Sequence, residues 1–508
     1  MSGHRLVIKD AARQLIGRII SALFGFLTIK IMTPYLGPLG YGDYSTILKY
    51  FAIWTALADL GLYVLAVKRL GAIKEAGNDP NNEKLKSEYG KFVGTRITIM
   101  AVIYFIAILI AYFLPAYTSN QYLIRGLPFG LIFSASFMLA GIQQLPLQIF
   151  WKMEQLSITL ITARLSQLAI LIPVVYIFFK DMKFDGSTIS IVAFCAILFS
   201  VVASGIGQNI EIHYRSKKIL PLKVIFDRKF TKSIVTKNRQ YGISYYLSSF
   251  HTLIVLLFLG RFFPTSGGND YAGIRALSLS LIEILLIIPS SLGNSLLHRI
   301  SNYSMETKRK SMGSLMTLVY RIGGIVALNF WIFADQIILI VSGKAFIGTF
   351  GLIQYRGSNQ ILPFLGVVLR RSFIKQIYNY LFVSVERQNV LLGINLFGVI
   401  IGVLVGLYTI PKYGLFGGII TQVLLEFLFM IGAIAVAKTK KINLITPRKT
   451  FWRLSIIIIV FGIIGFTLTQ YIKMTILNFF IIAILLNLAL VYISLPSIKK
   501  VARGLTFE

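Results

Sequence analysis

The sequence predicts an all-α, polytopic membrane protein with about 14 transmembrane helices. Hydrophobic residues make up 56% of its 508 positions, more than a soluble domain can bury. They gather in runs of about 20 residues, the helix length that crosses the hydrocarbon core of a bilayer. Strongly basic loops alternate along the chain with loops that carry little charge. This alternation is typical of a protein that crosses the membrane many times.

Breaks at proline, glycine and charge clusters set the limits of the apolar spans. The expected spans are 12–33, 42–66, 92–114, 124–149, 157–179, 188–212, 241–263, 272–296, 314–341, 360–383, 389–410, 414–437, 451–472 and 475–496. Because their number is even, both termini are expected on the same side of the membrane.

The formal net charge of +32 comes mainly from the loops on one side, which include 67–91 and 213–240. By the positive-inside rule that side is cytosolic. We therefore expect both termini in the cytosol. Contact with anionic headgroups accounts for these charges, so membrane lipids, and no nucleic acid, are the expected partners.

Three short matches in the same order predict two halves with the same topology, although each match alone could arise by chance. The matched pairs are Arg13-Gln14 with Arg239-Gln240, Asp43-Tyr44 with Asp270-Tyr271, and Phe150 and Glu154 with Phe382 and Glu386. Parallel repeats place the substrate site between the halves. The predicted architecture is thus two six-helix lobes around a central cavity plus two extra C-terminal helices. Its parts are an N-lobe 1–213, a cytosolic amphipathic connector 214–240, a C-lobe 241–437, and spans 13 and 14 with a tail, 438–508.

Cations within the spans are the strongest functional signal. Arg370, Arg371 and Lys375 lie near the middle of span 360–383. A cation there costs about 2.5–3.5 kcal/mol, so it usually faces a water-filled cavity or a partner. The same cationic cavity is expected to include Arg18, Lys49, Arg164 and Arg275. Snorkelling to the headgroups explains the cations near span ends, Arg96, Arg125 and Arg261.

The excess of cations over acids predicts an anionic ligand such as a pyrophosphate, whose oxygens match the planar guanidinium fork. The acids within the spans are Asp59, Glu283, Asp335 and Glu426. We expect them to pair with cations. Asp59, Glu283 and Glu426 are also the candidates for coupling transport to H+ or Na+. We expect no other cofactor, and no metal, because Cys195 is the single cysteine and the four histidines have no ligand spacing.

Motifs in the first 70 residues resemble a known group of transporters. They are the loop Pro34-Tyr35-Leu36-Gly37-Pro38-Leu39-Gly40-Tyr41-Gly42-Asp43-Tyr44 and the segment Ala58-Asp59-Leu60-Gly61-Leu62. The turn Glu386-Arg387-Gln388 is also similar. The chain thus resembles the bacterial polysaccharide-biosynthesis flippases, of the O-antigen type, in the multidrug/oligosaccharidyl-lipid/polysaccharide (MOP) exporter superfamily.

This resemblance implies that the protein lies in a bacterial cytoplasmic (inner) membrane. It also implies two six-helix lobes around a V-shaped cavity that opens alternately to either side. It also implies cationic cavity residues on spans one, two and eight, where this chain has Arg18, Lys49 and Arg275. The related lipid II flippases carry a sodium site of acids and amides on spans seven and eleven. Span seven of this chain has no acid, so that site is not carried over.

We therefore predict a transporter, not an enzyme: a flippase that moves undecaprenyl-pyrophosphate-linked oligosaccharide across the membrane by alternating access for surface polysaccharide biosynthesis. Other polysaccharide-assembly proteins are expected as partners. One alternative is a multidrug or toxin exporter of the same superfamily, which would favour a net acidic cavity. A membrane glycan polymerase or ligase is a further alternative, but it would need a large external catalytic loop. The glycan, the energy source and the oligomeric state stay open.

Overall fold

The computed structural model has an all-α fold, with no β-strand in the part of the chain that it describes. The described residues are 2–76, 83–150, 152–180, 190–236, 242–243, 246–247, 255, 258–259, 262, 268–287, 289–290, 304–348, 357–385, 388–444, 448–471, 478–490 and 492. Within them, seven helices are long and apolar enough to cross a bilayer. The predicted fold class, a multi-pass helical membrane protein, is confirmed. Most of the predicted span 241–263 lies outside the described residues.

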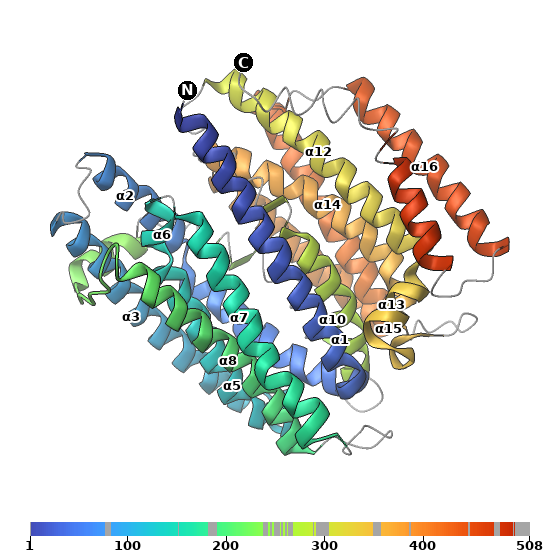
Figure 1. Ribbon diagram of the computed structural model, residues 1–508, viewed down its shortest axis with the longest axis horizontal. Coiled ribbons are helices and arrows are strands. Elements are labelled where there is room, and N and C mark those ends of the chain that lie inside the picture. Colours follow the sequence, from blue (N-terminus) through green and yellow to red (C-terminus); the bar gives the residue numbers. More distant parts are fainter. Residues whose placement is uncertain are drawn as a thin grey trace. The chain divides into compact units, whose positions relative to one another are not determined.

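The chain forms two compact units, Met1–Gly273 and Ile274–Glu508. The helices of the first unit are α1 (Ser2–Asp59), α2 (Leu62–Ala76), α3 (Glu83–Phe113), α4 (Pro115–Thr118), α5 (Gln121–Gln143), α6 (Leu145–Ile149), α7 (Met153–Pro173) with the π-helical turn η1 (Val174–Phe178), and α8 (Ile191–Ser216). Within this unit α7 packs against α8 and α1, and α8 packs against α5 (Figure 1).

Two predicted spans, 12–33 and 42–66, form the single kinked helix α1. The kink is at Gly37, whose φ of 64° is a left-handed conformation that glycine adopts without steric cost. Pro34 and Pro38 flank the kink and remove backbone N–H donors there. The second predicted span ends early, because Leu60 and Gly61 also have positive φ and separate α1 from α2.

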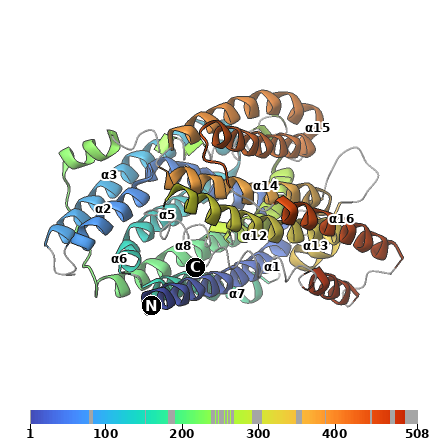
Figure 2. The same ribbon diagram turned by 90° about the horizontal axis from the view of Figure 1, so that it is seen from above.

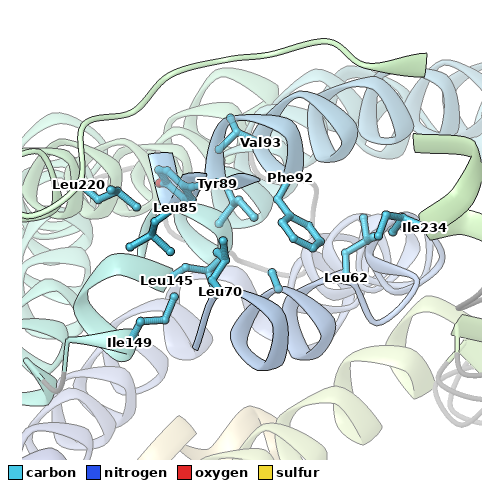
Figure 3. Packing of buried hydrophobic residues seen from close by; sticks show 12 residues of the cluster. Leu62, Leu70, Leu85, Tyr89, Phe92, Val93, Leu145, Ile149, Leu220 and Ile234 are labelled. Carbon is cyan, nitrogen blue, oxygen red and sulfur yellow. The ribbon is translucent and has the colours of Figure 1, made fainter. Parts of the chain in front are cut away.

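Of the predicted connector 214–240, the described residues are helical over 214–216, the end of α8, and over 228–236, and 221–227 is an extended strap across α3. The Ile225 N–H donates to the Gly90 carbonyl oxygen at 3.0 Å. A Cβ on Gly94 would lie 2.2 Å from the Ile225 carbonyl oxygen, so the strap needs glycine there. Figure 3 shows Leu220 and Ile234, at the two ends of this segment, within the hydrophobic cluster of α2, α3 and α6.

Helix α10 (Gly268–Leu285) crosses the boundary between the units. The helices of the second unit are then α12 (Met305–Ile332), α13 (Ala334–Ser342), the 3-10 turn η2 (Lys344–Phe346), α14 (Ser358–Ser384), α15 (Gln388–Thr439) and α16 (Arg448–Tyr471), followed by a shorter helix, Asn478–Leu490. α14 packs between α12 and α15. Figure 2 shows α15 folded back on itself beside α14.

Two span limits differ from the prediction in this unit. Spans 389–410 and 414–437 are merged in α15, which is kinked at Gly414 with φ 54°. Pro411 precedes that glycine by three residues, just as Pro34 precedes Gly37. The predicted span 314–341 is broken at Phe333, which separates α12 from α13.

The two C-terminal helices pack on α12. A hydrophobic cluster joins them, and its buried members are Leu328, Ile332, Phe333, Ile458, Phe479, Leu486 and Leu490. A polar pair lies within this interface: the Asn329 and Asn487 amides each donate to the other at 3.0 Å. Because each amide has a hydrogen-bond partner, neither is left as an unpaired polar group in the apolar interface.

Candidate functional site

The three central cations of α14 lie against aromatic faces of the neighbouring helices. The guanidinium carbon of Arg370 lies 4.0 Å from the centroid of the Tyr320 ring on α12. Small residues bring the two helices close at this level, since a Cβ on Gly323 would lie 3.5 Å from the Arg370 Cα. A guanidinium stacked on an aromatic ring is stabilised by the ring's negative face, most strongly when water is excluded.

Arg371 points to α15 instead. Its guanidinium carbon lies 4.2 Å from the centroid of the Phe427 ring, and Nη1 lies 3.2 Å from the Met430 sulfur. Both Arg370 and Arg371 are half-buried. Their Nε–H groups are buried and donate to no acceptor among the described residues. No carboxylate of the described part lies within 4.0 Å of either guanidinium. Each thus retains hydrogen-bonding capacity that the described part of the chain does not use.

Lys375 lies one turn further along α14 and has a carboxylate partner. Its Nζ is 3.6 Å from the Glu426 Oε1 and 4.2 Å from the centroid of the Phe429 ring, both on α15. The Lys375 side chain is 15% exposed and that of Glu426 is 5% exposed. The expected pairing of Glu426 with a cation is therefore present.

Arg275, on α10, reaches the same stretch of α15. It is buried, and its Nη2 donates to the Gln422 Oε1 at 2.9 Å. Gln422 precedes Glu426 by four residues, so the two lie on one face of the helix. Residues 422–430 of α15 thus supply contacts to Arg275, Arg371 and Lys375.

The remaining predicted site residues lie in the first unit, in separate groups. Arg164 donates from Nη1 to the Gln167 Oε1 at 3.1 Å, and it lies close to Tyr44. Arg18 is half-buried on α1 and close enough to Tyr63 to interact electrostatically. Lys49 is half-buried further along α1.

One cation assigned to snorkelling is placed differently. Arg96 is buried, and its Nη2 lies 2.9 Å from the Asp59 Oδ1. The snorkelling prediction is wrong for Arg96 because its acid partner sits on another helix, at the end of α1. The expected pairing of Asp59 is present.

The other two acids within the predicted spans have different surroundings. Asp335 accepts a hydrogen bond from the Asn359 amide at 2.7 Å. Glu283 is exposed on α10 and interacts electrostatically with Arg275. Among the described residues no group of three or more His, Cys, Asp or Glu has the arrangement of a metal site.

Sequence reasoning missed most of the residues that hold the cations. These are Tyr320, Gln422, Phe427, Phe429 and Met430. An aromatic residue in an apolar span is normally interpreted as core packing. Its position in the sequence does not show which cation it will contact. The one usable signal was the polar pair Gln422 and Glu426, four residues apart in an otherwise apolar span.

Comparisons with known proteins place this geometry in a family. Residues 7–290 match the family described as "Polysaccharide biosynthesis protein". No curated protein matches the chain. Among solved structures, the lipid II flippase MurJ in an inward closed conformation is similar, with a TM-score of 0.69, 13% identity, and coverage of 96% of this chain and 99% of that one.

Two conformations of a multidrug resistance MATE family transporter of the MOP superfamily are also similar. The inward-facing one has a TM-score of 0.57 at 12% identity, covering 85% of this chain and 99% of that one. The outward-facing one has a TM-score of 0.57 at 14% identity, covering 86% and 95%. At such identities these likenesses show the fold. The family match spans more than half of the sequence, and the resemblance drawn from the N-terminal motifs is confirmed: this chain belongs to the polysaccharide biosynthesis protein family.

Proposed function

We propose that the protein is a flippase for undecaprenyl-pyrophosphate-linked oligosaccharides. The family match and the fold it shares with a lipid flippase and with drug exporters support a transporter rather than an enzyme. On this proposal both termini are cytosolic and the protein lies in the bacterial inner membrane, where it supplies surface polysaccharide assembly.

One observation carries the choice of an anionic cargo. Arg370 and Arg371 are neighbours in α14 that rest on aromatic rings of two different helices, α12 and α15, and their buried Nε–H groups have no acceptor among the described residues. Neighbouring positive charges repel each other, so leaving these two guanidinium groups without a neutralising acid lowers the stability of the protein. A pyrophosphate would relieve the repulsion and accept several charge-assisted hydrogen bonds at once.

The proposed mechanism uses these cations together. The α14 cations, with Arg275 and the first-unit cations Arg18, Lys49 and Arg164, neutralise the pyrophosphate while the polyprenyl tail stays among the lipid chains. Opening of the cavity first to one side and then to the other carries the head group across. Because the cations neutralise the phosphate charge, the head group avoids the free-energy cost of carrying a bare charge through a low-dielectric region.

Coupling to an ion is part of the same proposal, with Asp59, Glu283 and Glu426 as candidates. In the structure Asp59 is held by Arg96 and Glu426 by Lys375. Either acid could bind a proton or sodium when its cation moves away. Exchange of Asp59 or Glu426 for the matching amide, with transport followed under imposed proton and sodium gradients, tests this assignment.

The test of the cargo site is surface-glycan export in cells that carry Arg370→Ala or Arg371→Ala in place of the wild type. We expect each variant to reach the membrane at normal level and to lose at least about tenfold in export, the effect of one lost charge-assisted contact. Lys310→Ala, which removes an exposed cation paired with Glu306 near the start of α12, is the control. Normal export by both arginine variants would reject the site.

A multidrug exporter is the second candidate, because two of the similar structures are drug transporters. It would bind cationic drugs, which the α14 cluster disfavours. Increased resistance to cationic drugs on overexpression, unchanged in the Arg370→Ala variant, would favour this candidate.

A further inference from the structure

Helix α12 packs against both α14, which carries the central cations, and the C-terminal helix α16. Its buried Tyr320 contacts the two neighbouring helices at once. The Arg370 guanidinium carbon lies 4.0 Å from the centroid of the Tyr320 ring, and the Tyr320 hydroxyl oxygen lies 3.2 Å from the Ser455 Oγ on α16. A continuous set of contacts therefore leads from α16 to the candidate cargo site.

A second contact brings α16 near the same arginine. Gly324 lies one turn beyond Tyr320 on α12, and a Cβ at this position would lie 2.4 Å from the Ile458 Cδ1 and 4.0 Å from the Arg370 Nε. Glycine at 324 thus lets α16 approach the Arg370 side chain closely. Ile458 follows Ser455 by three residues, so both belong to one face of α16. That face meets α12 at the level of Arg370.

An arginine that is to bind an anion needs a support that does not occupy its hydrogen-bond donors. A carboxylate would occupy them, whereas a stacked ring holds the guanidinium plane and leaves its N–H edges available to oxygen acceptors. The buried Arg370 Nε–H has no acceptor among the described residues. Holding one long side chain in its bound conformation before the ligand arrives is worth about two- to tenfold in affinity.

We propose that Tyr320 and Ser455 are positioning residues for Arg370: α16 fixes the Tyr320 ring through the hydroxyl contact, and the ring holds the guanidinium ready for a phosphate. Helix α16, which lies outside the predicted repeat, is then a support of the cargo site. Its apolar cluster with α12 attaches it to the protein but requires no hydroxyl at position 455. This inference rests on the proposed function of the α14 cations and adds the residues that orient one of them.

The experiment measures binding of a short-chain prenyl diphosphate sugar to purified full-length protein in detergent. Ser455→Ala and Tyr320→Phe each remove the hydroxyl contact and keep the ring, so we expect either to weaken binding by about threefold. Because both substitutions break the same contact, the double variant should bind about as well as either single variant. Tyr320→Leu, which removes the ring itself, should weaken binding by about tenfold.

Two controls separate positioning from a structural role. Thr467→Val removes a hydroxyl of α16 that bonds to the Ile463 and Ile464 carbonyl oxygens of its own helix, and it should leave the affinity unchanged. In an Arg370→Ala background, Ser455→Ala should have no further effect on binding, because the side chain that it orients is gone. The same loss in both backgrounds, or additive losses in the Ser455→Ala/Tyr320→Phe double variant, would overturn the inference.

The failure of this inference can be told apart from failure of the proposed function. If the wild type does not bind the prenyl diphosphate sugar, or if Arg370→Ala binds it equally well, the proposed site falls and the inference falls with it. If Arg370→Ala weakens binding while Ser455→Ala and Tyr320→Leu leave it unchanged, the cargo site stands and the positioning role of Tyr320 and Ser455 is rejected.

Discussion

Arg96 Nη2 lies 2.9 Å from Asp59 Oδ1, so an ion pair joins α3 to the last residue of α1. The side chains are 6% and 19% exposed. The pair sits where Leu60 and Gly61 break the helix. Asp59 thus has a structural task at this break, whatever part it takes in transport.

Loss of one member of this pair should be more harmful than loss of both. Arg96→Met leaves the Asp59 carboxylate buried without its cation, and we expect it to destabilise the protein by about 3–5 kcal/mol. Asp59→Asn combined with Arg96→Met should recover part of that loss. Thermal unfolding in detergent measures the difference, and equal losses in the single and double variants would contradict the pairing.

The extended strap over α3 gives a prediction with a matched control. Gly94→Ala places a Cβ 2.2 Å from the Ile225 carbonyl oxygen and must push the strap away. Gly71→Ala, on α2, meets nothing within 4 Å. We expect faster proteolysis at the exposed Lys223 for Gly94→Ala, and no change for Gly71→Ala. Equal cleavage of the two variants would show that the strap is not seated on α3.

Asp227 makes the seating of the connector depend on pH. The Phe230 N–H and the Lys91 ammonium, 2.9 Å and 3.1 Å from its two carboxyl oxygens, hold the pKa of this carboxyl below its usual range. Because the pKa is lowered, the contacts of the ionised Asp227 stabilise the connector fully at pH values above the unfolded-state pKa of about 4. This stabilisation is lost as the pH falls below that value. Connector proteolysis should rise on acidification through that range. Asp227→Asn should flatten the response, and an unchanged pH profile in that variant would exclude this carboxyl.

The Asn329–Asn487 pair predicts how the C-terminal helices are attached. Asn329→Leu leaves the Asn487 amide without its partner in an apolar interface, at a cost of about 1 kcal/mol. The double leucine variant, which has no orphaned amide, should be more stable than either single variant. Unfolding midpoints of the three proteins test this, and additive losses would contradict a reciprocal pair.

The apolar runs predicted the helices well, because the hydrocarbon core fixes their length and composition. Span 360–383, for example, corresponds to α14, Ser358–Ser384. The break at Phe333 could not be predicted, since no proline or glycine marks it. The kinks at Gly37 and Gly414 carry a signal, Pro-x-x-Gly, but the sequence does not show that the helix continues beyond them.

The cations were found from sequence because a buried charge stands out in an apolar run. Their partners were not, since contacts such as Arg370 with Tyr320 or Arg371 with Phe427 depend on the packing of helices far apart in the chain. The same reason explains the wrong prediction for Arg96. Its proximity to a span end suggested snorkelling, and only the fold shows that Asp59 reaches it.

The most direct test of the central claim is translocation in proteoliposomes. Purified wild type should move a fluorescent undecaprenyl-pyrophosphate-linked oligosaccharide from one leaflet to the other faster than protein-free vesicles do. The Arg370→Ala/Arg371→Ala double variant, reconstituted at the same density, should fall to the protein-free rate. Translocation by the double variant at the wild-type rate would contradict the claim that these arginines carry the phosphate.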